Sequence, residues 1–194
     1  MIRIKQYLGL LSILIVTGCS HQIQISPELS ELRSNNSAKS SKTVGYYISA
    51  VDKATEVTSA GGGGDDVKYF PYKDTEAALK TILSQKFTKV YALKEKTNDP
   101  LIKSKGIQFI FEPKIKTMSS SSSAFTWPPT DFEVELTCTA YNQQGKNIWQ
   151  KTVVGKGHAE FSEFKHEFAL SAKRSSNQAF IKMRDEIIAA KILK

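Results

Sequence analysis

Histidine and cysteine are scarce in this sequence, and the motifs through which they usually support catalysis are missing. The 194 residues include three histidines and two cysteines. No HExxH zinc motif occurs, and no serine lies in a GxSxG nucleophile elbow. The glycine run at 61–64 lacks the Lys-Ser/Thr pair that completes a phosphate-binding P-loop. We therefore expect a protein that is not an enzyme and that carries no metal, nucleotide or other cofactor.

Blocks of like charge are also missing. Lysine and arginine together exceed the acidic residues by 27 to 19, which gives a formal net charge of +8. The basic residues are scattered, however, and no block of five or more occurs. This dispersion does not favour nucleic-acid binding, so we expect no nucleic-acid partner. Weak attraction to anionic lipid headgroups or peptidoglycan fits the excess of positive charge better.

The first 18 residues have the pattern of a signal peptide rather than of a membrane-spanning helix. Arg3 and Lys5 are followed by an apolar run at 8–16 and then by small residues. The run has nine residues, whereas a helix that crosses a bilayer needs about 20. A short core helix and a plain secretory signal are the alternatives.

The tetrapeptide Val16-Thr17-Gly18-Cys19 closes this run and resembles the lipobox of bacterial lipoproteins. The resemblance implies cleavage before Cys19, a diacylglyceryl group on its thiol and, usually, an acyl chain on its new amine. Two or three acyl chains anchor a protein stably, because each buried methylene contributes about 0.8 kcal/mol. Ser20, where a retention signal usually has Asp, implies sorting to the outer membrane, and we expect the periplasmic face.

The lipobox divides the sequence into a signal peptide (1–18), a lipidated flexible tether (19–43) and a globular domain (44–194). The tether is rich in Ser, Asn, Lys and Gln, so it is expected to reach roughly 25 Å without a core of its own. Its apolar residues, available for local docking, are Ile23, Ile25, Leu29 and Leu32. With Cys19 lipidated, Cys138 has no partner for an internal disulfide. Its place in an alternating strand predicts a small buried side chain.

Apolar spacing predicts an α/β (α+β) domain in which a mixed, largely antiparallel five-stranded sheet packs against two main helices. Residues 132–141 alternate between apolar and polar side chains, and a turn at 142–146 leads to a returning strand at 147–154. The segments at 55–74 and 155–164 are expected to be irregular. The remaining elements are expected at 44–51, 89–93 and 107–111 for strands, and at 74–87 and 167–191 for helices.

Two aromatic clusters beside loops are candidate partner-binding residues. Tyr69, Phe70 and Tyr72 follow the glycine run, and Phe125 and Trp127 follow a run of five serines. Large apolar side chains are unusual in solvated loops, and aromatic side chains supply much of the contact area at interfaces. Packing of either cluster over the sheet is the alternative.

The order of these elements after a lipobox resembles small envelope lipoproteins whose domain is similar to the amino-terminal domain of TolB, to YajG-type lipoproteins and to LptE. The resemblance implies a lipid-anchored accessory component that binds an envelope protein or an envelope glycoconjugate. Two alternatives stay open. One is an extracytoplasmic hydrolase of cell wall or glycan, and the other is a carrier of lipid or lipopolysaccharide.

Overall fold

The computed structural model describes residues 19–34 and 39–194, and within these residues the chain forms five α-helices and two mixed sheets. The predicted signal peptide, including Val16, Thr17 and Gly18, lies outside the described residues. Among the described residues, no helix is both long and apolar enough to cross a membrane. The elements in chain order are β1 (Ser20–Gln22), β2 (Ser40–Tyr47), α1 (Ala50–Ala54), β3 (Val57–Ala60), β4 (Asp66–Tyr69), α2 (Pro71–Lys86), β5 (Phe87–Leu93), α3 (Pro100–Ser104), β6 (Phe109–Ser120), β7 (Asp131–Asn142), β8 (Asn147–His158), α4 (Phe161–Phe164), α5 (Leu170–Ala189) and a 3-10 turn (Lys191–Leu193).

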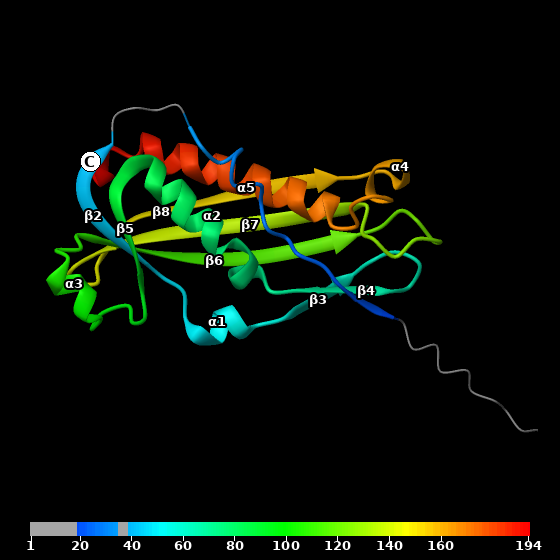
Figure 1. The fold of residues 1–194 in the computed structure, drawn as a ribbon, viewed down its shortest axis with the longest axis horizontal. Helices are drawn as coiled ribbons and strands as arrows, with labels where there is room; N and C mark the ends of the chain where they lie inside the picture. Colours follow the sequence, from blue (N-terminus) through cyan, green and yellow to red (C-terminus); the bar gives the residue numbers. More distant parts are fainter. Residues whose placement is uncertain (1–18, 35–38) are drawn as a thin grey trace, which may run out of the picture.

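The larger sheet has five strands in the order β5-β2-β6-β7-β8, which confirms the predicted fold class. β2 runs parallel to both β5 and β6, and β6, β7 and β8 form an antiparallel meander. The helices α2 and α5 pack against each other over one face of this sheet (Figure 1). The main core therefore lies between these two helices and the sheet.

The predicted alternation in β7 is confirmed by the burial of its side chains. Every second residue from Phe132 to Ala140 points into the core and is at most 3% exposed. Cys138 belongs to this row, and its burial raises the pKa of the thiol to about 12. A neutral thiol of this kind packs as a small apolar group.

The strand β8 continues to His158, although we predicted an irregular segment from residue 155. Two glycines explain the difference. A Cβ atom on Gly155 would lie 2.1 Å from the carbonyl oxygen of Ser175, and one on Gly157 would lie 2.0 Å from that of Ser171. The glycines therefore let α5 lie directly on the strand. Glycine has a low propensity for strands, so the local sequence did not predict a strand here. The strand forms because α5 packs against it.

Side chains of α5 also cover part of the outer border of β8. Lys182 Nζ donates to the carbonyl of Val154, Gln178 Oε1 accepts from the amide of Lys156, and Arg174 donates to the carbonyl of His158. These backbone groups face away from β7. Without the side chains of α5 they would be unpaired donors and acceptors on an edge strand.

The smaller sheet has the order β1-β4-β3 and comes from segments that the sequence analysis assigned to the tether and to a loop. β1 runs parallel to β4, and β3 runs antiparallel to it. The sheet is joined to β6 through Tyr69, whose hydroxyl lies 2.7 Å from Thr117 Oγ1. Strands of three or four residues carry too little alternation to be recognised by pattern alone.

Candidate functional site

The segment after Cys19 lies on the domain and is not a free spacer over residues 19–34. Ile23, Ile25 and Leu32 are 5%, 0% and 0% exposed, and all three belong to the main core. The amide of Ile23 donates to the carbonyl of Lys68 at 2.9 Å, which continues the pairing of β1 with β4. The expected local docking of these side chains is therefore seen, whereas the expected flexible reach is not seen in this part of the segment.

Cys19 itself is fixed at the edge of the smaller sheet. Its amide donates to Asp65 Oδ1 at 3.0 Å, and its carbonyl accepts from the amide of Asp66 at 3.0 Å. The second oxygen of Asp65, Oδ2, lies 3.0 Å from His21 Nε2. The Cys19 side chain remains exposed. An exposed thiol is thus held immediately beside the turn that contains Asp65.

The glycine run at 61–64 forms this turn and contacts the serine-rich loop. Gly62 donates to the carbonyl of Trp127 at 2.7 Å, and Gly63 donates to that of Ser123 at 3.2 Å. A Cβ atom on Gly62 would lie 1.9 Å from the carbonyl oxygen of Thr126. Because only glycine allows so close an approach of two backbones, the run serves loop packing.

Aromatic side chains gather where these two loops meet α4. The indole of Trp127 stacks on His21 and also contacts Phe168, whose ring centroid is 4.9 Å away. Phe125 is 97% exposed, Phe161 is 61% exposed and Phe168 is 50% exposed. Between them lies an open groove of about 590 Å3, which we call the aromatic groove. Its lining residues are Gly63, Asp65, Ala124, Phe125, Thr126, Trp127, Pro128, Phe161, Phe164, Lys165 and Phe168.

The groove and Cys19 lie at the same end of the molecule. Figure 1 shows β1, the tips of the loops around residues 61–65 and 121–130, and α4 at one end of the long axis. The C-terminus and α3 lie at the opposite end. A single hydrogen bond also links the two, because Asp65 lines the groove and accepts from the Cys19 amide at 3.0 Å.

Only two of the five predicted contact residues line this groove, namely Phe125 and Trp127. Tyr69 is fully buried between the two sheets. Tyr72 is half-buried, and its hydroxyl accepts from the amide of Ile115 at 3.3 Å. Phe70 precedes α2 and contacts Lys73, with the ammonium 5.4 Å from the ring centroid. Tyr69 and Tyr72 therefore pack within the domain, as the alternative interpretation of this cluster has it, and Phe70 does not line the groove.

Sequence reasoning missed Phe161 and Phe164 as groove residues and placed Phe168 in the C-terminal helix. The structure puts Phe168 two residues before α5 and Phe161 at the start of α4. A signal was present, since Phe161 and Phe164 fall in the segment predicted to be irregular and Phe168 follows four residues after Phe164. Such a density of large apolar side chains outside a helix or strand suggests a surface with a role.

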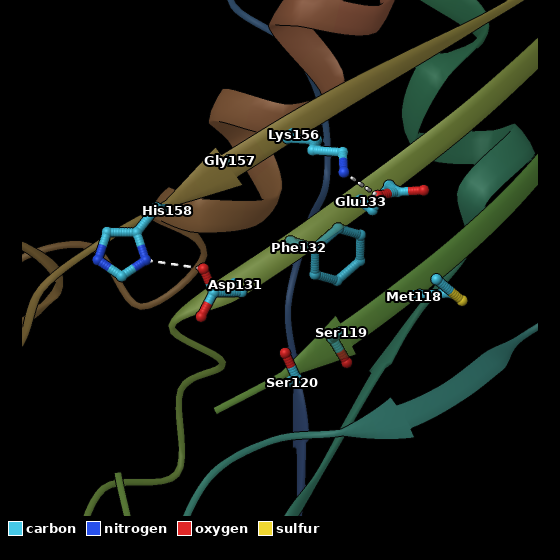
Figure 2. Close-up of a pocket in the computed structure, with 9 residues that line it drawn as sticks. All are labelled: Met118, Ser119, Ser120, Asp131, Phe132, Glu133, Lys156, Gly157 and His158. Atoms are coloured by element: carbon cyan, nitrogen blue, oxygen red, sulfur yellow. Dashed lines mark hydrogen bonds and ion pairs between the residues drawn. The ribbon is translucent and has the colours of Figure 1, made fainter. Parts of the chain in front are cut away.

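A second hollow of about 480 Å3 lies at the same end of β6, β7 and β8 (Figure 2). His158 lies between two carboxylates there, with Nδ1 2.8 Å from Asp131 Oδ1 and Nε2 2.8 Å from Glu160 Oε1. The hydrogen bonds that His158 donates to Glu160 and then to Asp131 raise its pKa above the ordinary 6.5, and the bond with His158 lowers the pKa of Asp131.

This cluster is an ion-pair arrangement at the ends of two strands. Both imidazole nitrogens are engaged by carboxylates, and Figure 2 shows Lys156 paired with Glu133 next to it. Ser119, which lines the same hollow, hydrogen-bonds to Ser59 of β3 at 2.8 Å. Among the described residues, no group of three or more His, Cys, Asp or Glu side chains is placed to hold a metal ion.

Comparison with known proteins gives structural likenesses and no family. No family model matches the sequence, and no curated protein matches it. The fold is similar to XCC0632 from Xanthomonas campestris, a protein of family model DUF330, with 10% identity, coverage of 89% of this chain and 92% of that one, and a TM-score of 0.48.

Two further solved structures are similar. The PelC dodecamer from Paraburkholderia phytofirmans has 12% identity, coverage of 75% of this chain and 94% of that one, and a TM-score of 0.40. A candidate lipoprotein from Caulobacter crescentus CB15 has 9% identity, coverage of 74% and 87%, and a TM-score of 0.35. At TM-scores below 0.5 these likenesses carry no conclusion about what this chain binds.

Proposed function

We propose that the protein is a lipid-anchored component of the bacterial cell envelope that works by binding an envelope protein or an envelope glycoconjugate. Acyl chains on Cys19 hold it in the outer membrane, on the periplasmic face. The observation that carries the proposal is the position of Cys19, which is exposed and lies next to an open aromatic groove. The likeness to TolB-type, YajG-type and LptE-type domains stays part of this proposal.

The contacts of Cys19 are compatible with the lipidated state. Acylation of an α-amine leaves an amide with one N–H group, and that group can still donate to Asp65 Oδ1. The thiol is the point of diacylglyceryl transfer, and it faces solvent in this structure. The hydrogen bonds that fix β1 therefore need no rearrangement when the acyl chains are added.

Phe125 and Trp127 remain the proposed contact residues, now joined in one groove by Phe161 and Phe168. We do not extend the proposal to Tyr69 or Tyr72, because both take part in packing within the domain. We also propose no catalytic role for the hollow around His158, because both of its nitrogens are committed to carboxylates.

The anchoring part of the proposal is tested with Cys19→Ser and with Cys138→Ser as the matched control. Cells are labelled with radioactive palmitate, and the protein is recovered from membranes. We expect the Cys19→Ser variant to lose the label and its processing to the mature size, whereas the Cys138→Ser variant keeps both. Label that persists without Cys19 would contradict the proposal.

The binding part is tested by in-cell crosslinking of the lipidated protein followed by mass spectrometry. We expect reproducible crosslinks to one envelope protein or glycoconjugate. We expect them to be lost in the Cys19→Ser variant, because an unprocessed protein without acyl chains is not sorted to the outer membrane. Crosslinks that form equally well without Cys19 would show that anchoring does not serve this binding.

A further inference from the structure

We propose that the aromatic groove is a membrane-docking surface, which seats the Cys19 end of the domain in the headgroup–acyl boundary of the bilayer that holds the acyl chains. This inference rests on the proposed lipidation of Cys19 and deepens it. It names the lipid surface as the occupant of the groove, so that Phe125 and Phe161 contact lipid. The envelope protein or glycoconjugate of the proposed function then binds the domain outside this groove.

The first step is that the structure leaves no spacer between the lipid attachment point and the folded domain. β1 begins at Ser20, directly after Cys19, and residues 23 and 25 are already in the core. The amide of Cys19 is itself bonded to Asp65. Acyl chains on Cys19 must therefore enter the bilayer from the surface of the domain, unless β1 is pulled away from β4.

The second step is that exposed apolar side chains are concentrated at this end. Phe125, Phe161 and Phe168 are 97%, 61% and 50% exposed, and all three line one groove. In the described residues the other exposed large apolar side chains lie singly on different elements, at Leu29, Val51, Met118 and Ile192. A contiguous apolar patch marks a contact surface, and aromatic rings suit a membrane interface because they tolerate both apolar and polar surroundings.

The third step concerns charge around the groove. Asp65 is the carboxylate in the lining, and its two oxygens already face the Cys19 amide and His21. Lys165 also lines the groove and is exposed, so it can bring an ammonium group to a headgroup phosphate. A bilayer placed against the groove would therefore contact aromatic rings and the Lys165 ammonium. The carboxylate of the lining, Asp65, is already hydrogen-bonded within the protein.

The test uses single tryptophan probes in the lipidated full-length protein. The chain has two tryptophans, Trp127 and Trp149, and both are replaced by phenylalanine. A single tryptophan is then introduced as Phe125→Trp in the groove or as Ile192→Trp at the opposite end. Position 192 is a matched control because its side chain is also exposed, at 60%. Each protein is reconstituted into phosphatidylethanolamine–phosphatidylglycerol liposomes that contain a phosphatidylcholine brominated near the headgroup end of its acyl chains.

We expect the tryptophan at position 125 to lose most of its emission to the brominated lipid and the one at 192 to keep its emission. Equal emission from both probes in liposomes that carry the protein would overturn the docking inference and leave the proposed anchoring intact. Shielding of position 125 by a copurifying envelope protein, without quenching by lipid, would also overturn it. A protein that lacks acyl groups and fails to float with the liposomes would instead contradict the proposed function.

Discussion

The indole of Trp127 stacks on the imidazole of His21, with ring centroids 4.1 Å apart and ring planes 14° apart. His21 also faces Asp65 Oδ2 at 3.0 Å. One side chain from β1 thereby joins the serine-rich loop to the glycine turn. The position of Cys19 depends on this contact, since Asp65 holds the Cys19 amide with its other oxygen.

His21→Ala should loosen this junction. We expect the free energy of unfolding to fall by about 1–2 kcal/mol, because a stacked ring pair contributes about 0.5–1.5 kcal/mol and the hydrogen bond with Asp65 contributes about 0.5–1.5 kcal/mol. Denaturant unfolding measures the loss, and hydrogen exchange at the Ile23 amide should quicken. His166→Ala is the control, since His166 is exposed. Equal effects of the two substitutions would rule out a special role for the stack.

Gly155→Ala should force α5 away from β8. The new methyl group would meet the carbonyl oxygen of Ser175 at 2.1 Å and the amide nitrogen of Ala179 at 2.5 Å. Overpacking of this kind costs about 1–3 kcal/mol, which thermal unfolding would show as a lower melting temperature. For comparison, Gly145→Asn should change stability by less than about 0.5 kcal/mol. Gly145 has φ 73° with open space around it, and Asn tolerates that backbone region.

His158 should titrate above the ordinary histidine pKa in the folded protein. Its charged form is favoured by the hydrogen bonds that it donates to Glu160 and Asp131, so its contribution to stability is complete below the unfolded pKa near 6.5. That contribution is lost as the pH rises through the higher folded pKa. NMR titration of the imidazole signals measures the shift, and both Glu160→Gln and Asp131→Asn should bring the pKa back down. An unchanged pKa in both variants would contradict this assignment.

Lys86→Met should destabilise the C-terminal end of α5. The Lys86 ammonium is buried and donates to the carbonyls of Ile187, Ile188 and Ala190 at 2.8, 3.1 and 2.7 Å. A cation at this end of a helix satisfies free carbonyls and opposes the negative end of the dipole. We expect a loss of about 2 kcal/mol in denaturant unfolding, because hydrogen bonds to charged groups are stronger than neutral ones. Lys80→Met, on the exposed face of α2, should be nearly neutral.

The sequence predicted those parts of the fold in which periodicity and packing agree. The alternation from Phe132 to Ala140 predicted β7, and the spacing of Leu79, Ile82 and Leu83 predicted α2, although its start at Pro71 lies a few residues earlier than expected. In both elements the side chains that define the pattern are the ones that the core buries. The apolar pattern of these two elements therefore predicts both the type of element and the face that it buries.

Prediction from the sequence failed where an element depends on a segment that lies far away along the chain. β1 pairs with β4, and each is too short to be recognised without the other. Gly155 and Gly157 favour a strand only because α5 needs their small size. The aromatic groove brings together Phe125 and Phe161, which no local pattern connects. Two of the five aromatic residues that line the groove, Phe125 and Trp127, could thus be named from the sequence, whereas the assembly of the groove could not.

The side chains that α5 lays along β8 also limit how copies of this protein can associate. A strand from another molecule could join the sheet beside Val154, Lys156 and His158 only after displacing Lys182, Gln178 and Arg174. Under the proposed anchoring, many copies share one membrane plane, where edge-to-edge pairing of exposed strands would favour aggregation. Because this stretch of β8 is already covered, a strand from another copy can extend the larger sheet only at β5 or along the first half of β8.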